Sequence, residues 1–95
     1  IYPNDIEEVL LSCPGVKEAA VIGLAHPKWG EAVTAVVVAM DGAQELNVQM
    51  LDAACAERLP GYMRPRRFEF CDSLPRNPTG KILRRVLRDQ YQTTK

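Results

Sequence analysis

The spacing of apolar side chains along the chain changes period and predicts a helix followed by two strands. Over residues 3–13, apolar positions recur three and four residues apart, as on one face of a helix. Pro14 and Gly15 then end this segment. Residues 16–25 and 31–40 are rich in β-branched and other apolar side chains, which favours two strands joined by a short turn.

The second part of the chain predicts two further helices with a short strand between them. A helix is expected over residues 48–59, with Asn47 as its N-cap. Residues 68–71 have the apolar alternation of a short strand, and residues 73–80 contain enough proline and glycine to form a loop. The last helix is expected over residues 82–92.

The faces of the last helix and the order of elements define the predicted fold. We expect an apolar side toward the core, formed by Leu83, Val86, Leu87 and Gln90, and a cationic side facing outward, formed by Arg84, Arg85 and Arg88. Two strands with so short a connection are expected to pair antiparallel. The order helix–strand–strand–helix–strand–helix predicts one α+β domain over residues 1–95, in which a small antiparallel sheet of about three strands is covered by helices.

Composition excludes several classes of protein. The chain has 95 residues, of which 46% are hydrophobic and 25% charged, as in an ordinary globular domain. Its longest apolar run, residues 35–40, is far below the about 20 residues of a membrane span, and the N-terminus lacks the pattern of a signal peptide. Three cysteines without a CxxC pair, and a single histidine, argue against a disulfide scaffold or a structural zinc site and indicate the reducing cytoplasm. Because the chain begins at Ile1 rather than at Met, we expect it to be part of a longer protein.

Charge is unevenly distributed although the net charge is zero. Residues 1–57 carry two basic and nine acidic side chains, a net charge of −7. Residues 58–95 carry ten basic and three acidic side chains, a net charge of +7. The second half is therefore expected to bind anions. Nucleic acid is the disfavoured alternative, because neither interleaved aromatic residues nor a nucleic-acid-binding signature accompanies these charges.

The segment RNPTGK at residues 76–81 is the most distinctive candidate for chemistry. Gly80 lets the backbone come close to a ligand, and Lys81 follows it with a point charge suited to phosphate or carboxylate oxygens. The segment is not a P-loop, because Pro75 and Ile82 stand where that motif needs Gly and Ser or Thr. Taken alone, a Gly-Lys pair in a loop is usually a solvated turn.

Five stretches together resemble the adenylate-forming enzymes, which include acyl-CoA synthetases, the adenylation domains of peptide synthetases and luciferases. The first, LPRNPTGKILRR at residues 74–85, resembles the closing motif of that family. The others, in chain order, are IYPNDIE at 1–7, PGV with AAVIG at 14–23, WGE at 29–31 and LPGYMRP at 59–65. The resemblance extends over essentially all 95 residues but covers only the small C-terminal domain of the family. The large N-terminal domain, with the ATP site and the acyl pocket, is not in this chain.

This resemblance implies a role for Lys81. In the family, the matching lysine enters the active site and bridges the substrate carboxylate and the α-phosphate of ATP while the acyl-adenylate forms. The resemblance also implies ATP and CoA as substrates, Mg²⁺ held by the large domain, and that large domain and a carboxylic acid as partners. Gly80 would position the loop.

The resemblance further implies that this domain offers a second surface for CoA during thioester formation. The matching residues are Trp29, Tyr62, Arg64 and Arg66. Aromatic faces stack on adenine, and guanidinium groups bind phosphates. The alternative is that the two aromatic residues pack on the hairpin and the sheet while the arginines are solvated or paired, and Met63 interrupts the basic run.

Three functions remain open on the sequence. The first is the mobile C-terminal domain of an acid–CoA ligase, the second is the same domain of an adenylation enzyme that loads a carrier protein, and the third is a nucleic-acid-binding module. The basic run at residues 64–67 favours free CoA as the acceptor. The acyl substrate, whether a fatty, aryl or other acid, cannot be predicted because its pocket belongs to the large domain.

Overall fold

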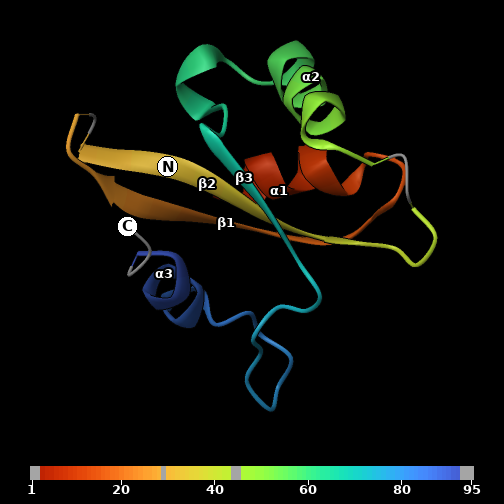
Figure 1. The fold of residues 1–95 in the computed structure, drawn as a ribbon, viewed down its shortest axis with the longest axis vertical. Helices are drawn as coiled ribbons and strands as arrows, with labels where there is room; N and C mark the ends of the chain where they lie inside the picture. Colours follow the sequence, from red (N-terminus) through yellow and green to blue (C-terminus); the bar gives the residue numbers. More distant parts are fainter. Residues whose placement is uncertain (1–2, 29, 44–45, 93–95) are drawn as a thin grey trace.

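The computed structural model describes residues 3–28, 30–43 and 46–92 and confirms the predicted α+β class (Figure 1). The elements are α1 (Pro3–Leu11), β1 (Val16–His26), β2 (Gly30–Ala39), α2 (Val48–Arg58), the 3₁₀ turn η1 (Gly61–Met63), β3 (Arg67–Cys71) and α3 (Arg84–Gln92). Their order is the predicted one. Within the described residues, no helix has the length and apolar character needed to cross a bilayer.

The three strands form one mixed sheet in the order β1-β2-β3. β1 and β2 pair antiparallel, as the short turn between them predicts. β3 runs parallel to β2, so the expectation of a wholly antiparallel sheet is wrong for this strand. The reason is the connection: α2 lies between β2 and β3, which gives the chain the length to return and enter the sheet in the same direction.

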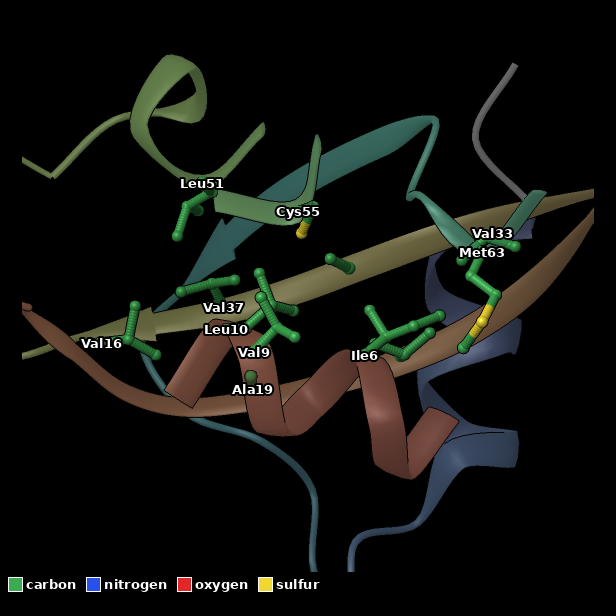
Figure 2. Close-up of a cluster of buried hydrophobic side chains, with 12 residues drawn as sticks. Ile6, Val9, Leu10, Val16, Ala19, Val33, Val37, Leu51, Cys55 and Met63 are labelled. Atoms are coloured by element: carbon green, nitrogen blue, oxygen red, sulfur yellow. The ribbon is translucent and has the colours of Figure 1, made fainter. Parts of the chain in front are cut away.

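Helices cover both faces of the sheet, and each face has its own core. On one face, side chains of α1 and α2 pack on alternate residues of β1 and β2, as Figure 2 shows. Ile6, Leu10 and Leu51 are fully buried there. On the other face, Leu87 of α3 packs against the intervening residues, among them Ile22 and Val36. Because both faces are buried, β1 and β2 have the nearly continuous apolar sequences of interior strands.

The two later helices differ in how closely they follow the prediction. Asn47 caps α2 as expected, since its side chain accepts a hydrogen bond of 2.9 Å from the N–H of Met50. α3 begins two residues later than expected, because Ile82 is still paired in the preceding loop. Leu87 is buried, but Val86 is 38% exposed and Gln90 is also exposed, so the predicted core-facing side is wrong at these two positions.

A buried carboxylate joins three elements at the free edge of the sheet. Glu7 of α1 accepts a hydrogen bond of 2.8 Å from the N–H of Val21 in β1. It also accepts one of 2.6 Å from Nη2 of Arg84, the first residue of α3. The expectation that Arg84 faces outward is therefore wrong. The interaction caps part of the edge that β1 leaves unpaired and ties α3 to α1.

Candidate functional site

Lys81 lies on the second arm of a tight hairpin loop between β3 and α3. Arg76 and Ile82 form an antiparallel bridge at the base of this loop. The N–H of Asn77 donates to the carbonyl of Lys81 at 2.9 Å, and the N–H of Lys81 donates to Oδ1 of Asn77 at 2.9 Å. Both backbone polar groups of Lys81 are therefore bound to one residue.

Gly80 occupies the position in this loop that demands glycine. Its φ is +90°, in the region that side chains with a Cβ atom rarely adopt. Its N–H donates to the carbonyl of Asn77 at 2.9 Å, which closes the turn. No atom lies within 4 Å of the place where a Cβ would stand, so backbone conformation rather than crowding selects glycine here.

The side chain of Lys81 is available to a ligand. Lys81 is exposed, and its ammonium makes no ion pair with any residue of the described ranges. Its backbone is held by Asn77, while its side chain is exposed and carries a compact charge suited to phosphate or carboxylate oxygens. The catalytic role of Lys81 stays a prediction.

Tyr62, Arg64 and Arg66 lie close together between α2 and β3. Tyr62 belongs to η1 and is 73% exposed. Arg64 lies 3.7 Å from a carboxylate oxygen of Asp52, both side chains being about half exposed. An open hollow of about 330 Å³ is lined by Gly61, Arg64, Pro65 and Arg66. Trp29, the fourth residue expected to contact CoA, lies outside the described residues.

Arg66 lines two hollows, and Arg67 contacts other residues of the domain. The N–H of Arg66 donates to the carbonyl of Val33 at 2.8 Å, which fixes its backbone beside β2. Arg66 and Arg67 also line a second hollow of about 360 Å³, together with residues at the ends of β1 and β2 that include His26 and Thr34. Arg67 pairs with Glu69, and its guanidinium lies 5.5 Å from the ring centre of Tyr91. Arg67 therefore contributes to packing and does not line the hollow formed by Arg64 and Arg66.

The segment of residues 61–66, which lines the first hollow, and the Lys81 loop meet opposite ends of β3; Figure 1 shows the two segments leading into and out of this strand. Arg67 pairs with Thr34 at one end of the strand, and Cys71 pairs with Val38 at the other. Four strand steps separate these ends by roughly 13 Å. The two surfaces are therefore separate parts of the domain.

Part of the positive charge of the second half is matched inside the domain. Among the described residues, three ion pairs join the basic half of the chain to the acidic half: Arg64–Asp52, Arg76–Glu18 and Arg84–Glu7. The anion-binding capacity expected from the net charge of +7 is therefore smaller than the count implies.

The cysteines do not have the properties of a catalytic or metal site. All three are free thiols. Burial raises the pKa of the Cys55 thiol to about 11 and also raises the pKa of Cys13 and Cys71, so each is protonated at neutral pH. No group of three or more His, Cys, Asp or Glu side chains arranged to hold a metal ion occurs in the part of the chain that the structure describes.

The sequence predicted no roles for Asn77, Arg76 or Glu18. Asn77 binds the backbone of the loop, and Arg76 joins that loop to Glu18 of β1. An Asn in a loop that contains proline and glycine is typical of side-chain bonding to backbone, and this signal could have identified Asn77. The partner of Arg76 could not be predicted, because Glu18 is 58 residues away along the chain.

The chain matches a known domain family and is similar in sequence to curated proteins. The family described as AMP-binding enzyme C-terminal domain matches residues 5–81. The long-chain-fatty-acid–CoA ligase FadD13 of Mycobacterium tuberculosis is 48% identical over 94 residues, which are 99% of this chain and 18% of that protein. The fatty acid–[acyl-carrier-protein] ligase ScoC of Streptomyces coeruleorubidus is 48% identical over 91 residues, 96% of this chain and 17% of that protein.

The chain is also similar in fold to a solved structure. The fold matches a Mycobacterium tuberculosis fatty acyl CoA synthetase with a TM-score of 0.92 and 48% identity, covering 98% of this chain and 18% of that one. The chain thus spans less than a fifth of the length of the relatives that it matches. It belongs to the C-terminal domain family of the AMP-binding, adenylate-forming enzymes.

Proposed function

We propose that this chain is the mobile C-terminal domain of an ATP-dependent acid–CoA ligase. The observation that carries the proposal is the hairpin of residues 76–82, which holds the backbone of Lys81 and leaves its ammonium exposed. The names of the relatives, which are ligases of fatty acids to CoA or to a carrier protein, support the reaction class.

Lys81 is the catalytic residue of the first half-reaction in this proposal. Forming an acyl-adenylate brings a carboxylate against the α-phosphate of ATP, and the two negative groups repel. An ammonium between them offsets that repulsion and stabilises the charge that develops at phosphorus. A lysine suits this position because its charge is compact and its stem can extend from a fixed backbone.

The second half-reaction uses the other end of β3. Arg64 and Arg66 hold the phosphates of CoA in the hollow that they line, and Tyr62 stacks on the adenine, together with Trp29. The separation of this hollow from Lys81 supports a rotation of the domain between the two steps. The large domain binds ATP, the acid and Mg²⁺, and no step assigned to this chain passes through the metal.

The test is to replace Lys81 by alanine in the full-length enzyme and to measure the two half-reactions separately. With acid and ATP, we expect kcat for adenylate formation to fall about 10²- to 10³-fold. With supplied acyl-adenylate and CoA, we expect a near-normal rate. Lys17→Ala, which removes an exposed lysine of β1, is the matched control and should leave both rates unchanged. Equal slowing of both half-reactions in Lys81→Ala would contradict the proposal.

Loading of a carrier protein is the second candidate for the acceptor step. The similarity to ScoC favours it, because that protein's name specifies an acyl-carrier protein. The hollow with two arginines favours free CoA, whose nucleotide carries phosphates that a protein-bound pantetheine lacks. Measuring thioester formation with free CoA and with a phosphopantetheinylated carrier protein separates the two candidates.

A further inference from the structure

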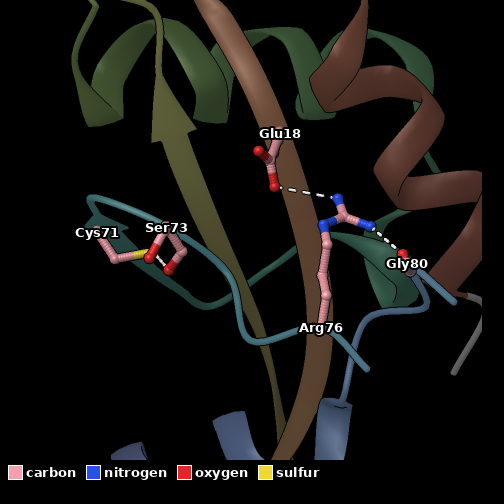
Figure 3. Close-up of polar contacts among 5 residues, drawn as sticks. All are labelled: Glu18, Cys71, Ser73, Arg76 and Gly80. Carbon is pink, nitrogen blue, oxygen red and sulfur yellow. Dashed lines mark hydrogen bonds and ion pairs between the residues drawn. The ribbon is translucent and has the colours of Figure 1, made fainter. Parts of the chain in front are cut away.

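Arg76 connects the Lys81 loop to the sheet. Its Nη1 donates to the carbonyl of Gly80 at 2.6 Å, and its Nη2 donates to Oε1 of Glu18 at 3.0 Å (Figure 3). Glu18 lies in β1, close to the end of the sheet where β3 finishes, since it pairs with Val38. One guanidinium therefore bridges the tip of the loop and a strand held by many backbone hydrogen bonds.

The bond from Arg76 acts on the peptide group that carries Lys81. The carbonyl of Gly80 and the N–H of Lys81 belong to the same planar peptide unit. Arg76 holds the oxygen of this unit, and Oδ1 of Asn77 accepts from its N–H at 2.9 Å. Oδ1 of Asn77 also accepts from the N–H and the hydroxyl of Thr79. The peptide group between Gly80 and Lys81 is thus held at both its oxygen and its N–H, which fixes the backbone that bears the Lys81 side chain.

We propose that Arg76 and Glu18 are positioning residues that set where Lys81 is presented. The inference rests on the proposed function of Lys81 and extends it to two residues that would touch neither substrate nor ATP. Asn77 shapes the hairpin itself, whereas the Glu18–Arg76 pair fixes that hairpin relative to β1. A lysine whose backbone is held in place loses less conformational entropy when its ammonium reaches the reacting oxygens.

The exposure of this pair argues for positioning rather than for stability. The side chains of Arg76 and Glu18 are 40% and 27% exposed, respectively. Exposed ion pairs contribute little to the stability of a fold. Removing this pair should therefore change the delivery of Lys81 more than the stability of the domain.

The experiment measures both half-reactions in the full-length enzyme carrying Glu18→Ala, Glu18→Gln or Arg76→Ala. For adenylate formation we expect kcat to fall about two- to fivefold in Glu18→Ala and about five- to thirtyfold in Arg76→Ala, which loses both contacts. KM for ATP, the thermal midpoint and thioester formation from supplied acyl-adenylate should be nearly unchanged. Glu18→Gln keeps an acceptor for Arg76 and should recover most of the rate.

A matched control removes a similar ion pair elsewhere. Glu69→Ala breaks the pair with Arg67 on β3 and should leave adenylate formation unaffected. Hydrogen exchange of peptides spanning residues 77–83 should be faster in Arg76→Ala than in the Glu69→Ala control.

The outcomes distinguish this inference from the proposed function. If Lys81→Ala slows adenylate formation but Glu18→Ala and Arg76→Ala do not, the positioning role is wrong and the function of Lys81 stands. If all variants, including Lys81→Ala, form adenylate normally, the proposed function fails as well. Equal loss of both half-reactions in Arg76→Ala, with a lowered thermal midpoint, would show a structural role only.

Discussion

Replacing Glu7 by alanine should destabilise the domain more than any other change of a single acidic residue in α1. The side chain of Glu7 is 12% exposed and accepts hydrogen bonds from the N–H of Val21 and from Arg84. Alanine would leave the N–H of an edge strand beneath α1 without an acceptor. It would also leave the Arg84 guanidinium without its carboxylate, and Nε of that arginine is already buried without a hydrogen-bond partner in the described structure.

The expected loss is roughly 2–4 kcal/mol in the free energy of unfolding. A buried backbone N–H that loses its acceptor costs about 1–3 kcal/mol. The Arg84 side chain is 30% exposed, so water compensates part of its lost pairing and about 1 kcal/mol remains. For a domain of this size the sum corresponds to a fall in Tm of roughly 10–25 °C.

Urea unfolding of the 95-residue chain, followed by far-UV circular dichroism, measures this loss. Glu8→Ala is the matched control, because Glu8 is the exposed neighbour on the same helix and its loss should cost below about 0.5 kcal/mol. Glu7→Gln keeps an acceptor for Val21 and should lie between the two. If Glu7→Ala is no more destabilising than Glu8→Ala, the edge contact contributes nothing and the reasoning is wrong.

Three other predictions follow from the same structure. In the full-length enzyme, Arg64→Ala and Arg66→Ala should each raise KM for CoA about tenfold to hundredfold and leave pyrophosphate release near normal, so unchanged KM in both would return these residues to a solvated surface. The 95-residue chain alone should unfold in one cooperative transition, because two buried cores close on one sheet, yet form no acyl-CoA from acid, ATP and CoA; turnover by the chain alone would refute this. Burial raises the pKa of Cys55 from 9.0 to about 11, so the folded state holds this proton more tightly than the unfolded state. The contribution of Cys55 to the free energy of unfolding is therefore fully present below pH 9 and is lost as the pH rises toward 11. The free energy of unfolding should fall less steeply over this range in Cys55→Ala than in the parent chain.

The sequence predicted the elements well because local patterns determine them. The apolar period distinguished α1 and α2 from β1 and β2, and Asn47 marked the start of α2. The direction of β3 was missed, since a five-residue strand has the same pattern whichever way it runs. Val86 was misplaced because α3 packs on its face of the sheet through a narrower set of side chains than the periodicity suggests, and Leu87 is the buried residue of this helix.

The sequence named candidate site residues but not the contacts that hold them. Gly80 and Lys81 were singled out by local chemistry and by the family resemblance, and the φ of +90° at Gly80 adds a conformational reason for glycine that the sequence analysis did not give. The contact of Arg76 with Glu18 depends on how distant segments pack, and no local pattern carries that information. Long-range ion pairs of this kind are visible only once the fold is known.

Ion pairs within the domain account for part of the uneven charge of the chain. Arg76 lies five residues before Lys81 and Arg84 lies three residues after it, and each binds an acidic residue from the first half of the chain. Glu18 of β1 holds one side of the Lys81 loop, and Glu7 of α1 holds the other. The acidic half therefore binds the basic half on both sides of Lys81, the residue that we propose to act on the substrate anions. If these two ion pairs position Lys81, the combination of Glu18→Ala with Glu7→Gln should slow adenylate formation more than either change alone. The rate of thioester formation from supplied acyl-adenylate should remain close to that of the parent enzyme.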